Sequence, residues 1–276
     1  DQIFSLATDT TSNYIGNMKV IGSHSNELFF EYQNYTADLY NKVQTLYAKL
    51  ETASDANKRD SIKNIISKIN LKNISFKNEF IEEYPDHILS LIFLILKEPE
   101  IPESLKAGSP GSKKRAYNFY KNNYWNLVDF NDPRLLKTPV FIKKINNYFN
   151  QVIPKHPDSV IIAADFIMNS CKDNEEVYRY LLFDLTSSFE QSNIMGYDKA
   201  FVHMVDNYFK GNQSEWISPS VYNNILERVE RIRPLLIGKF APELILMDTL
   251  GNFKSLYEEK NDFTIVLFWT LTCGEC

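Results

Sequence analysis

The stretch that decides the fold class extends from Asn26 to Leu50 and reads NELFFEYQNYTADLYNKVQTLYAKL. Its apolar residues recur at spacings of three and four, a period that places them along one stripe of a helix. They are Leu28, Tyr32, Tyr35, Leu39, Val43, Leu46 and Leu50. We therefore expect one long amphipathic helix here.

The helical pattern continues well beyond this stretch. A second long helix is expected after Ser54-Asp55, antiparallel to the first, and Tyr84-Pro85 ends it because proline disfavours helix in the residue before it. The apolar run at 88–97 indicates a buried helix, and the proline- and glycine-containing segment 98–112 indicates a loop. Further helices are expected at approximately 113–125, 139–151, 158–171, 174–191, 198–210 and 219–232.

Proline marks three of the expected helix starts. Pro139, Pro157 and Pro219 each stand just inside a helix, and Thr138 and Ser218 precede two of them as capping hydroxyls. The helices show no fixed sequence period, so a regular solenoid is not supported. We predict a mainly α fold built as an irregular array of antiparallel helices.

The two ends of the chain differ from this helical domain, which we place at 25–236. Residues 1–24 are expected to be extended, as the remnant of an upstream β domain or as a hairpin laid on the helices. In residues 237–276 the apolar period becomes that of strands, with a buried strand that begins at Phe263 and runs into the last two cysteines.

Composition limits the classes of partner. The net charge of the 276-residue chain is −5, and acidic and basic residues are interleaved along it and not segregated. This charge distribution favours neither nucleic acid nor an anionic membrane as a partner. No apolar run reaches the roughly 18 residues that a transmembrane helix needs. The chain begins with Asp1 and shows no leader, so we interpret it as a mature form or an excised piece of a longer protein.

The three cysteines are too few for a disulfide-stapled scaffold. Cys171 ends an apolar helix, and we interpret it as a small buried hydrophobe. Cys273 and Cys276 form a Cys-x-x-Cys pair behind the expected strand. If the pair opens a helix, the unpaired backbone N–H groups of its first turn would stabilise the thiolate of Cys273.

This spacing assigns a role to each cysteine of the pair. Cys273 is the candidate nucleophile, and Cys276 lies near enough to close the disulfide as the resolving thiol. Glu275 disfavours a neighbouring thiolate, so we expect a more reducing pair than proline at that position would give. Two other readings stay open: an incidental buried pair, and half of a zinc site whose remaining ligands would come from the scattered His24, His87, His156 and His203.

A series of residues in the last part of the chain carries a family resemblance. They are Gly238-Lys239-Phe240-Ala241-Pro242-Glu243-Leu244, Asp248, Gly251, Val266-Leu267-Phe268-Trp269 and Cys273-Gly274-Glu275-Cys276. The series resembles the opening of an extracytoplasmic thioredoxin-like domain of the TlpA/ResA and AhpC/TSA type, and covers residues 238–276. It departs from that family at Thr272, where tryptophan is usual, and at Glu275, where proline is usual.

The helical part also carries a resemblance. The residues concerned are Asp132 to Phe141, Pro157-Asp158-Ser159, Phe201 to Met204, Tyr208, Gly211 and Trp216. They are similar to an α-helical domain of uncharacterised function that precedes thioredoxin-like modules in Bacteroidetes-type envelope proteins. The two resemblances together imply a periplasmic or cell-envelope protein, secreted or lipid-anchored, with the truncated N-terminal part of an α/β thioredoxin-like fold at 237–276.

The resemblance implies thiol–disulfide exchange through Cys273 and Cys276, without a cofactor or a metal. Its partners would be a disulfide-bearing protein substrate and a thiol electron donor, and residues 1–276 alone are expected to be inactive. One alternative is a helical protein- or peptide-binding module with a degenerate redox domain. The other is an AhpC/TSA-like peroxidase, which places threonine where this chain has Thr270 and proline where it has Val266.

A few residues of the helical part could have either a functional or a structural role. We interpret His203 as a core histidine rather than a ligand, and Asp132 with Arg134 as a structural ion pair rather than a catalytic one. An aromatic cluster stands beside the 98–112 loop, and we interpret it as core, with a peptide-binding groove as the alternative. Its members are Tyr117, Phe119, Tyr120, Tyr124 and Trp125.

Overall fold

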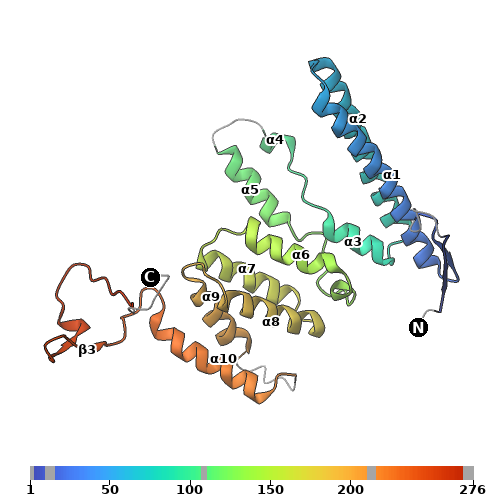
Figure 1. Ribbon diagram of the computed structural model, residues 1–276. Coiled ribbons are helices and arrows are strands. Elements are labelled where there is room, and N and C mark those ends of the chain that lie inside the picture. The colour runs from blue at the N-terminus through green and yellow to red at the C-terminus, as the bar shows by residue number, and fades with distance from the viewer. Residues whose placement is uncertain (1–2, 10–15, 107–110, 210–215, 270–276) are drawn as a thin grey trace. The chain divides into compact units, whose positions relative to one another are not determined.

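The computed structural model describes residues 3–9, 16–106, 111–209 and 216–269. They are mainly α-helical, as predicted (Figure 1). The chain divides into two compact units, 1–152 and 153–276. The helices and strands are β1 (Ser5–Ala7), β2 (Lys19–Ile21), α1 (His24–Thr52), α2 (Ala56–Glu83), α3 (Ile88–Leu96), α4 (Glu103–Lys106), α5 (Ser112–Asn123), α6 (Pro139–Asn147), α7 (Pro157–Ser170), α8 (Glu175–Glu190), α9 (Tyr197–Met204), α10 (Pro219–Ile232), β3 (Ile245–Met247) and β4 (Phe253–Ser255).

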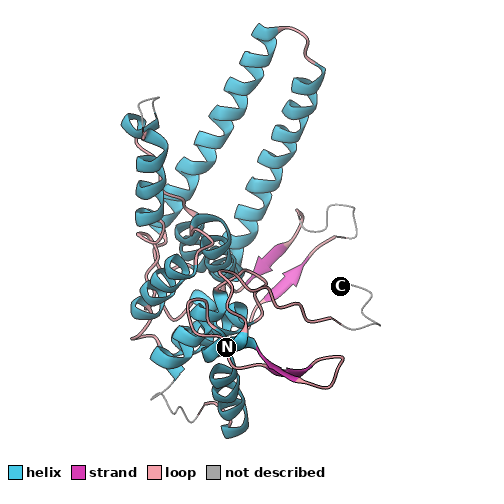
Figure 2. Cartoon of the chain, turned by 90° about the vertical axis from the view of Figure 1, so that its left-hand side faces the viewer, coloured by secondary structure: helices cyan, strands magenta, loops and turns pink. Residues whose placement is uncertain are grey.

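Helices α1 and α2 form a long antiparallel pair, which Figure 2 shows side by side. Every residue of the predicted α1 stripe is buried or half-buried, so the periodicity identified the packed face correctly. Ser23 and Asp55 cap the two helices by accepting hydrogen bonds from backbone N–H groups. Arg59 joins the helices near the turn by donating to the carbonyl oxygens of Leu50 and Ala53 at 3.0 and 3.2 Å.

The well-buried end of this pair meets α3. Leu28 of α1 and Phe80 of α2 form one apolar cluster with Leu89 and Phe93 of α3. His87 caps α3 with Nδ1, which accepts from the Leu89 N–H, and its Nε2 lies 2.8 Å from Ser25 Oγ. This cluster therefore joins the start of α1, the end of α2 and α3.

The N-terminal segment forms a small hairpin. β1 pairs antiparallel with β2, with Ser5 opposite Ile21. The amide of Asn34 in α1 donates to the carbonyl oxygen of Gly16 at 3.2 Å, which attaches the hairpin to that helix.

In the second unit, α7, α8 and α9 pack against one another. Their contact residues include Ile167, Leu181 and Phe201, whose side chains are completely buried. The helices approach closely where α9 begins: a Cβ on Gly196, which has φ 87°, would lie 3.0 Å from Pro157 Cγ. Glycine at 196 is therefore required both by the backbone conformation and by the packing.

Two short π-helical segments extend helices of the array. Tyr148–Val152 follows α6, and Val205–Phe209 follows α9. π-helical turns occur frequently at functional sites, and these two carry Tyr148 and Tyr208.

The predicted helix starts at proline are confirmed, but one predicted cap is wrong. Ser218 Oγ accepts from the Val221 N–H, as expected. Thr138 instead donates its hydroxyl to the carbonyl oxygen of Leu135 at 2.8 Å, so it makes no side-chain cap on α6. The preceding 3-10 turn, Leu135–Lys137, offers this nearby acceptor, and the hydroxyl bonds to it instead.

Residues 237–269 form one hairpin and a short turn. β3 pairs with β4, with Ile245 opposite Ser255, and a capping box between Ser255 and Glu258 starts a 3-10 turn at Leu256–Glu258. The strand period expected in residues 237–276 thus corresponds to β3 and β4 within the described residues.

The buried strand predicted from Phe263 is wrong for the described part of that segment. Residues 263–269 have neither helix nor strand, and Phe263 and Ile265 are 91% and 93% exposed. A strand needs a paired neighbour and a covered face, and among the described residues β3 and β4 pair only with each other. The apolar pattern of residues 263–269 provides neither the paired strand nor the covering layer.

Candidate binding site

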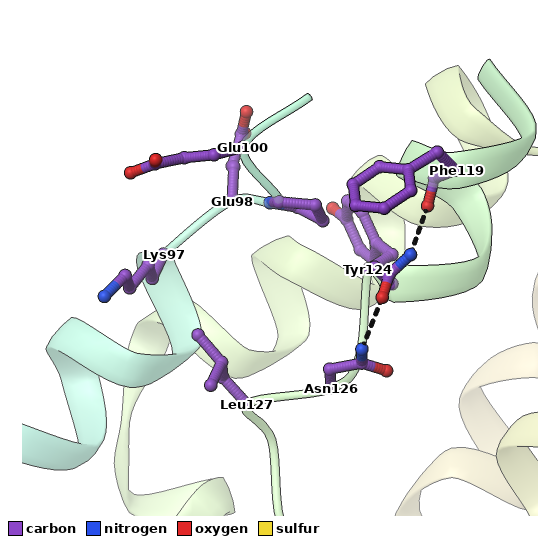
Figure 3. A pocket seen from close by; sticks show the side chains of 9 residues that line it. Lys97, Glu98, Glu100, Phe119, Tyr124, Asn126 and Leu127 are labelled. Atoms are coloured by element: carbon purple, nitrogen blue, oxygen red, sulfur yellow. Dashed lines mark hydrogen bonds between the residues drawn. The ribbon is translucent and has the colours of Figure 1, made fainter. Parts of the chain in front are cut away.

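A pocket of about 360 Å³ lies within the first unit, between the extended segment after α3 and the end of α5. Figure 3 shows Lys97, Glu98 and Glu100 on one side and Phe119, Tyr124 and Asn126 on the other. The complete lining is Lys97, Glu98, Pro99, Glu100, Phe119, Asn123, Tyr124, Asn126 and Leu127. Its size falls in the range of about 300–1,000 Å³ that is usual for ligand sites.

Two amide side chains hold the α5 wall in shape. Asn123 Nδ2 donates to the carbonyl oxygen of Phe119 at 2.8 Å, and Asn126 Nδ2 donates to Asn123 Oδ1 at 2.6 Å (Figure 3). The opposite wall is extended because Pro99 and Pro102 cannot continue α3. Both walls are therefore fixed by local sequence.

A buried lysine underlies this region. Lys144 of α6 is 6% exposed, and its Nζ donates to the carbonyl oxygens of Ile95 and Lys97 at 2.6 and 3.1 Å. These carbonyls end α3, where a cation is favoured by the helix dipole. Burial nevertheless lowers the pKa of Lys144 to about 8, and the carboxylate of Glu98 partly opposes that shift.

Aromatic rings surround the same ammonium group. Lys144 Nζ lies 4.7 Å from the centre of the Tyr124 ring and 5.8 Å from that of Trp125. Tyr148, on the first π-helical segment, stacks on Tyr124 with ring centres 5.1 Å apart. Burial raises the pKa of Tyr124. Lys144 is thus held by carbonyl groups and π faces rather than by a buried carboxylate.

The predicted aromatic cluster divides into two parts. Tyr124 and Trp125 are buried, as core residues should be. Phe119 lines the pocket, and Tyr117 is 37% exposed with its hydroxyl donating to the carbonyl oxygen of Val152 at 2.9 Å. The core interpretation is correct for the first two residues, and the hollow beside Phe119 is what the groove alternative requires.

The carboxylates of this site were not predicted. Glu98 and Glu100 are exposed residues that flank Pro99, and sequence reasoning treated the segment only as a loop. Glu98 also contributes, after burial, to the raised pKa of Tyr120, so it lies close to the α5 side of the pocket. The sequence Glu-Pro-Glu-Ile-Pro at 98–102 was the available signal, because its prolines indicate an extended segment and its glutamates give that segment like charges.

Comparison with protein families matches residues 52–234 to the family described as Domain of unknown function (DUF5106). The match covers more than half of the chain. The chain belongs to this family. The DUF5106 region includes the pocket, Lys144 and helices α2 to α10, and it ends before the segment with the terminal cysteines. Comparison with curated proteins and with solved structures gave no match.

A second polar cluster of the DUF5106 region joins α7 to α9. His203 Nε2 and the hydroxyl of Tyr208 both donate to Asp165 Oδ1 at 2.6 Å, and Asn207 Nδ2 lies 3.2 Å from His203 Nδ1. Tyr208 and Asn207 belong to the second π-helical segment, and burial raises the pKa of Tyr208. The histidine bridges two helices, but its side chain is 25% exposed, so it lies at the edge of the core and not within it as the sequence interpretation had placed it.

Two further sequence interpretations can be compared with the DUF5106 structure. Asp132 and Arg134 form the predicted ion pair, with Nη2 and Oδ2 2.7 Å apart and the aspartate side chain 13% exposed. Hydrogen bonds from Arg134 hold the pKa of Asp132 below its usual value. Cys171 is completely buried, and burial raises the pKa of its thiol to about 12, so it is inert as predicted.

The residues predicted to carry the chemistry, Cys273 and Cys276, lie outside the described part of the chain, and so does Thr270. Within the described ranges no three histidine, cysteine, aspartate or glutamate side chains gather in a way that could hold a metal ion. No helix in those ranges combines the length and apolarity needed to cross a membrane.

Proposed function

We propose that this chain belongs to a thiol–disulfide oxidoreductase of the cell envelope, in which the helical DUF5106 region recognises or positions the substrate. The observation that carries the proposal is the Cys-x-x-Cys pair at 273–276, which follows the apolar segment 263–269. Its context resembles the opening of a thioredoxin-like domain of the TlpA/ResA and AhpC/TSA type. The envelope location rests on the same resemblance.

The proposed reaction transfers two electrons to the substrate. The Cys273 thiolate attacks one sulfur of a substrate disulfide, forming a mixed disulfide and releasing the other sulfur as a thiolate, which takes up a proton. Cys276 then loses its proton and attacks Cys273 Sγ, which breaks the mixed disulfide and releases the second substrate thiol. The resulting Cys273–Cys276 disulfide is reduced by an external dithiol donor.

The test uses the full-length protein and two variants. Cys276→Ser should accumulate mixed disulfides on Cys273 that non-reducing electrophoresis detects and reductant removes. Cys273→Ser/Cys276→Ser is the matched control and should trap nothing. A Cys276→Ser protein that traps no partner, together with a wild-type protein that cannot reduce a model disulfide, would overturn the proposal.

A second candidate function is a protein- or peptide-binding module whose cysteines do no chemistry. The pocket beside Phe119 favours it, because aromatic walls and a few polar groups are typical of peptide sites. Cys273→Ser/Cys276→Ser in the full-length protein separates the two candidates. If the protein acts by binding alone, the double variant retains the function of the wild type in the cell. If it acts by disulfide exchange, the double variant loses that function.

A further inference from the structure

The extended segment 97–100 has a hollow on each side. One is the pocket of about 360 Å³ beside α5, and the other, of about 220 Å³, lies beside α2 and α3. Both are lined by Lys97, Glu98 and Glu100, so they adjoin across this segment. We propose that the two hollows form one site for a polypeptide segment that carries a basic side chain next to an aliphatic one.

The charge of the larger pocket selects the basic side chain. The charged side chains of its lining are Lys97, Glu98 and Glu100, and both glutamates are exposed. Lys97 Nζ donates to Asn78 Oδ1 at 3.1 Å, and in Figure 3 its side chain extends away from Phe119. The two carboxylates therefore dominate the mouth of the pocket.

A further cation near the larger pocket, Lys144, interacts with the carboxylate of Glu98 but is itself buried. Lys144 is sealed under the site and donates to the carbonyl oxygens of Ile95 and Lys97. An incoming guanidinium or ammonium group would meet Glu98 and Glu100 as charge-assisted acceptors and Phe119 as an aromatic wall. An anionic group would meet the same two carboxylates at the entrance and be repelled.

The smaller hollow selects the aliphatic neighbour. Ile74 and Leu96 line it and are 46% and 50% exposed, and Phe93 forms a buried surface beneath them. Its second lysine, Lys77, lies over the Phe93 ring at 5.5 Å. Covering these exposed apolar groups with an aliphatic side chain removes their surface from water, which favours binding.

This inference names the ligand of the recognition role in the proposed function, and its test does not involve the cysteines. The probe is a fluorescent hexapeptide with one arginine followed by one leucine, and its binding to the 276-residue chain is followed by anisotropy. We expect Glu98→Gln/Glu100→Gln to weaken binding about tenfold or more, because charge-assisted hydrogen bonds become neutral ones. Glu103→Gln is the matched control, since Glu103 starts α4, a few residues beyond the 97–100 segment and outside both hollows, and should leave affinity unchanged.

A second pair of variants tests the aliphatic part. Ile74 and Ile65 are exposed to similar extents on α2, at 46% and 44%, but only Ile74 lines the hollow. We expect Ile74→Asn to weaken hexapeptide binding several-fold and Ile65→Asn to leave it unchanged. Circular dichroism establishes that all variants retain the wild-type helical content.

Three results would overturn the inference. The first is equal binding of a hexapeptide with glutamate in place of arginine. The second is equal binding of N-acetylarginine amide, because that would make the ligand a small organic cation rather than a polypeptide. The third is unchanged affinity in both Glu98→Gln/Glu100→Gln and Ile74→Asn. If the full-length wild-type protein binds the hexapeptide but cannot reduce a model disulfide, the result counts against the proposed redox function and not against this inference.

Discussion

The helical part and residues 237–269 use the same kinds of apolar side chain in opposite ways. Phe201 in α9 is completely buried, whereas Phe240 and Phe263 are each 91% exposed. Apolar burial is the main favourable term in folding, so the helical part contains its own core and the described C-terminal segment does not. The difference teaches that the helical scaffold with its pocket and the segment that leads to the Cys-x-x-Cys pair are separate parts of the protein.

The largest expected effect on stability comes from replacing one phenylalanine by alanine in each part and comparing the two losses in the free energy of unfolding. Phe201→Ala should lower the free energy of unfolding by about 3–5 kcal/mol, because it leaves a cavity in a close-packed core. Phe240→Ala should change it by less than about 0.5 kcal/mol. Urea denaturation followed by circular dichroism measures both. Comparable losses in the two variants would remove the contrast between the parts.

The next effect tests the buried charge that distinguishes the first unit. The pKa of Lys144 is about 8 in the folded protein, below its ordinary value, so between pH 8 and about 10.5 the unfolded state binds more protons. The free energy of unfolding of the wild type should therefore rise with pH in that window relative to Lys144→Met, by on the order of 2 kcal/mol. Below pH 8 both states are protonated and the difference should be flat.

Lys143 supplies the matched control for this measurement. It is the exposed neighbour of Lys144 on α6, so Lys143→Met should show no pH-dependent difference from the wild type. Equilibrium unfolding of the three proteins at pH 7, 8, 9 and 10 gives the comparison. A difference between wild type and Lys144→Met that stays constant, or falls as pH rises, would contradict the assignment.

A smaller effect is expected at the start of α10. Ser218→Ala removes the hydroxyl that accepts from the Val221 N–H and should cost about 1 kcal/mol of unfolding free energy. Asn223→Ala, at an exposed position of the same helix, is the control and should be neutral or slightly stabilising because alanine favours helix. Equal effects in thermal unfolding would show that the cap does not stabilise α10.

Much of the helical architecture could be predicted because its signals are local. The period from Leu28 to Leu50 identified the packed face of α1, and Pro139, Pro157 and Pro219 marked helix starts within a residue. Thr138 failed as a predicted cap because a hydroxyl can also donate, and the carbonyl oxygen of Leu135 was within reach. Whether the Thr138 hydroxyl donates to a carbonyl oxygen or accepts from a helix N–H depends on the turn that precedes the helix.

The site was less predictable because it depends on contacts between distant residues. Nothing in the sequence near Lys144 shows that its ammonium group will reach the carbonyl oxygen of Ile95, 49 positions away. The pocket likewise joins the 97–100 segment to the end of α5, and spacing alone does not bring Glu98 beside Phe119. The sequence pattern indicated the aromatic side of the pocket, which includes Phe119 and Tyr124, but not the acidic side formed by Glu98 and Glu100.

The proposed separation of substrate recognition from disulfide exchange can be measured directly in the full-length protein. The assay compares the reduction rates of two disulfides: a peptide disulfide flanked by arginine and leucine, and hydroxyethyl disulfide, which has neither a basic nor an aliphatic side chain for the pocket. We predict that Glu98→Gln/Glu100→Gln lowers kcat/KM about tenfold for the peptide and leaves it unchanged for hydroxyethyl disulfide. Equal rates for wild type and variant with both disulfides, or an equal loss with both, would contradict a recognition site in the helical part.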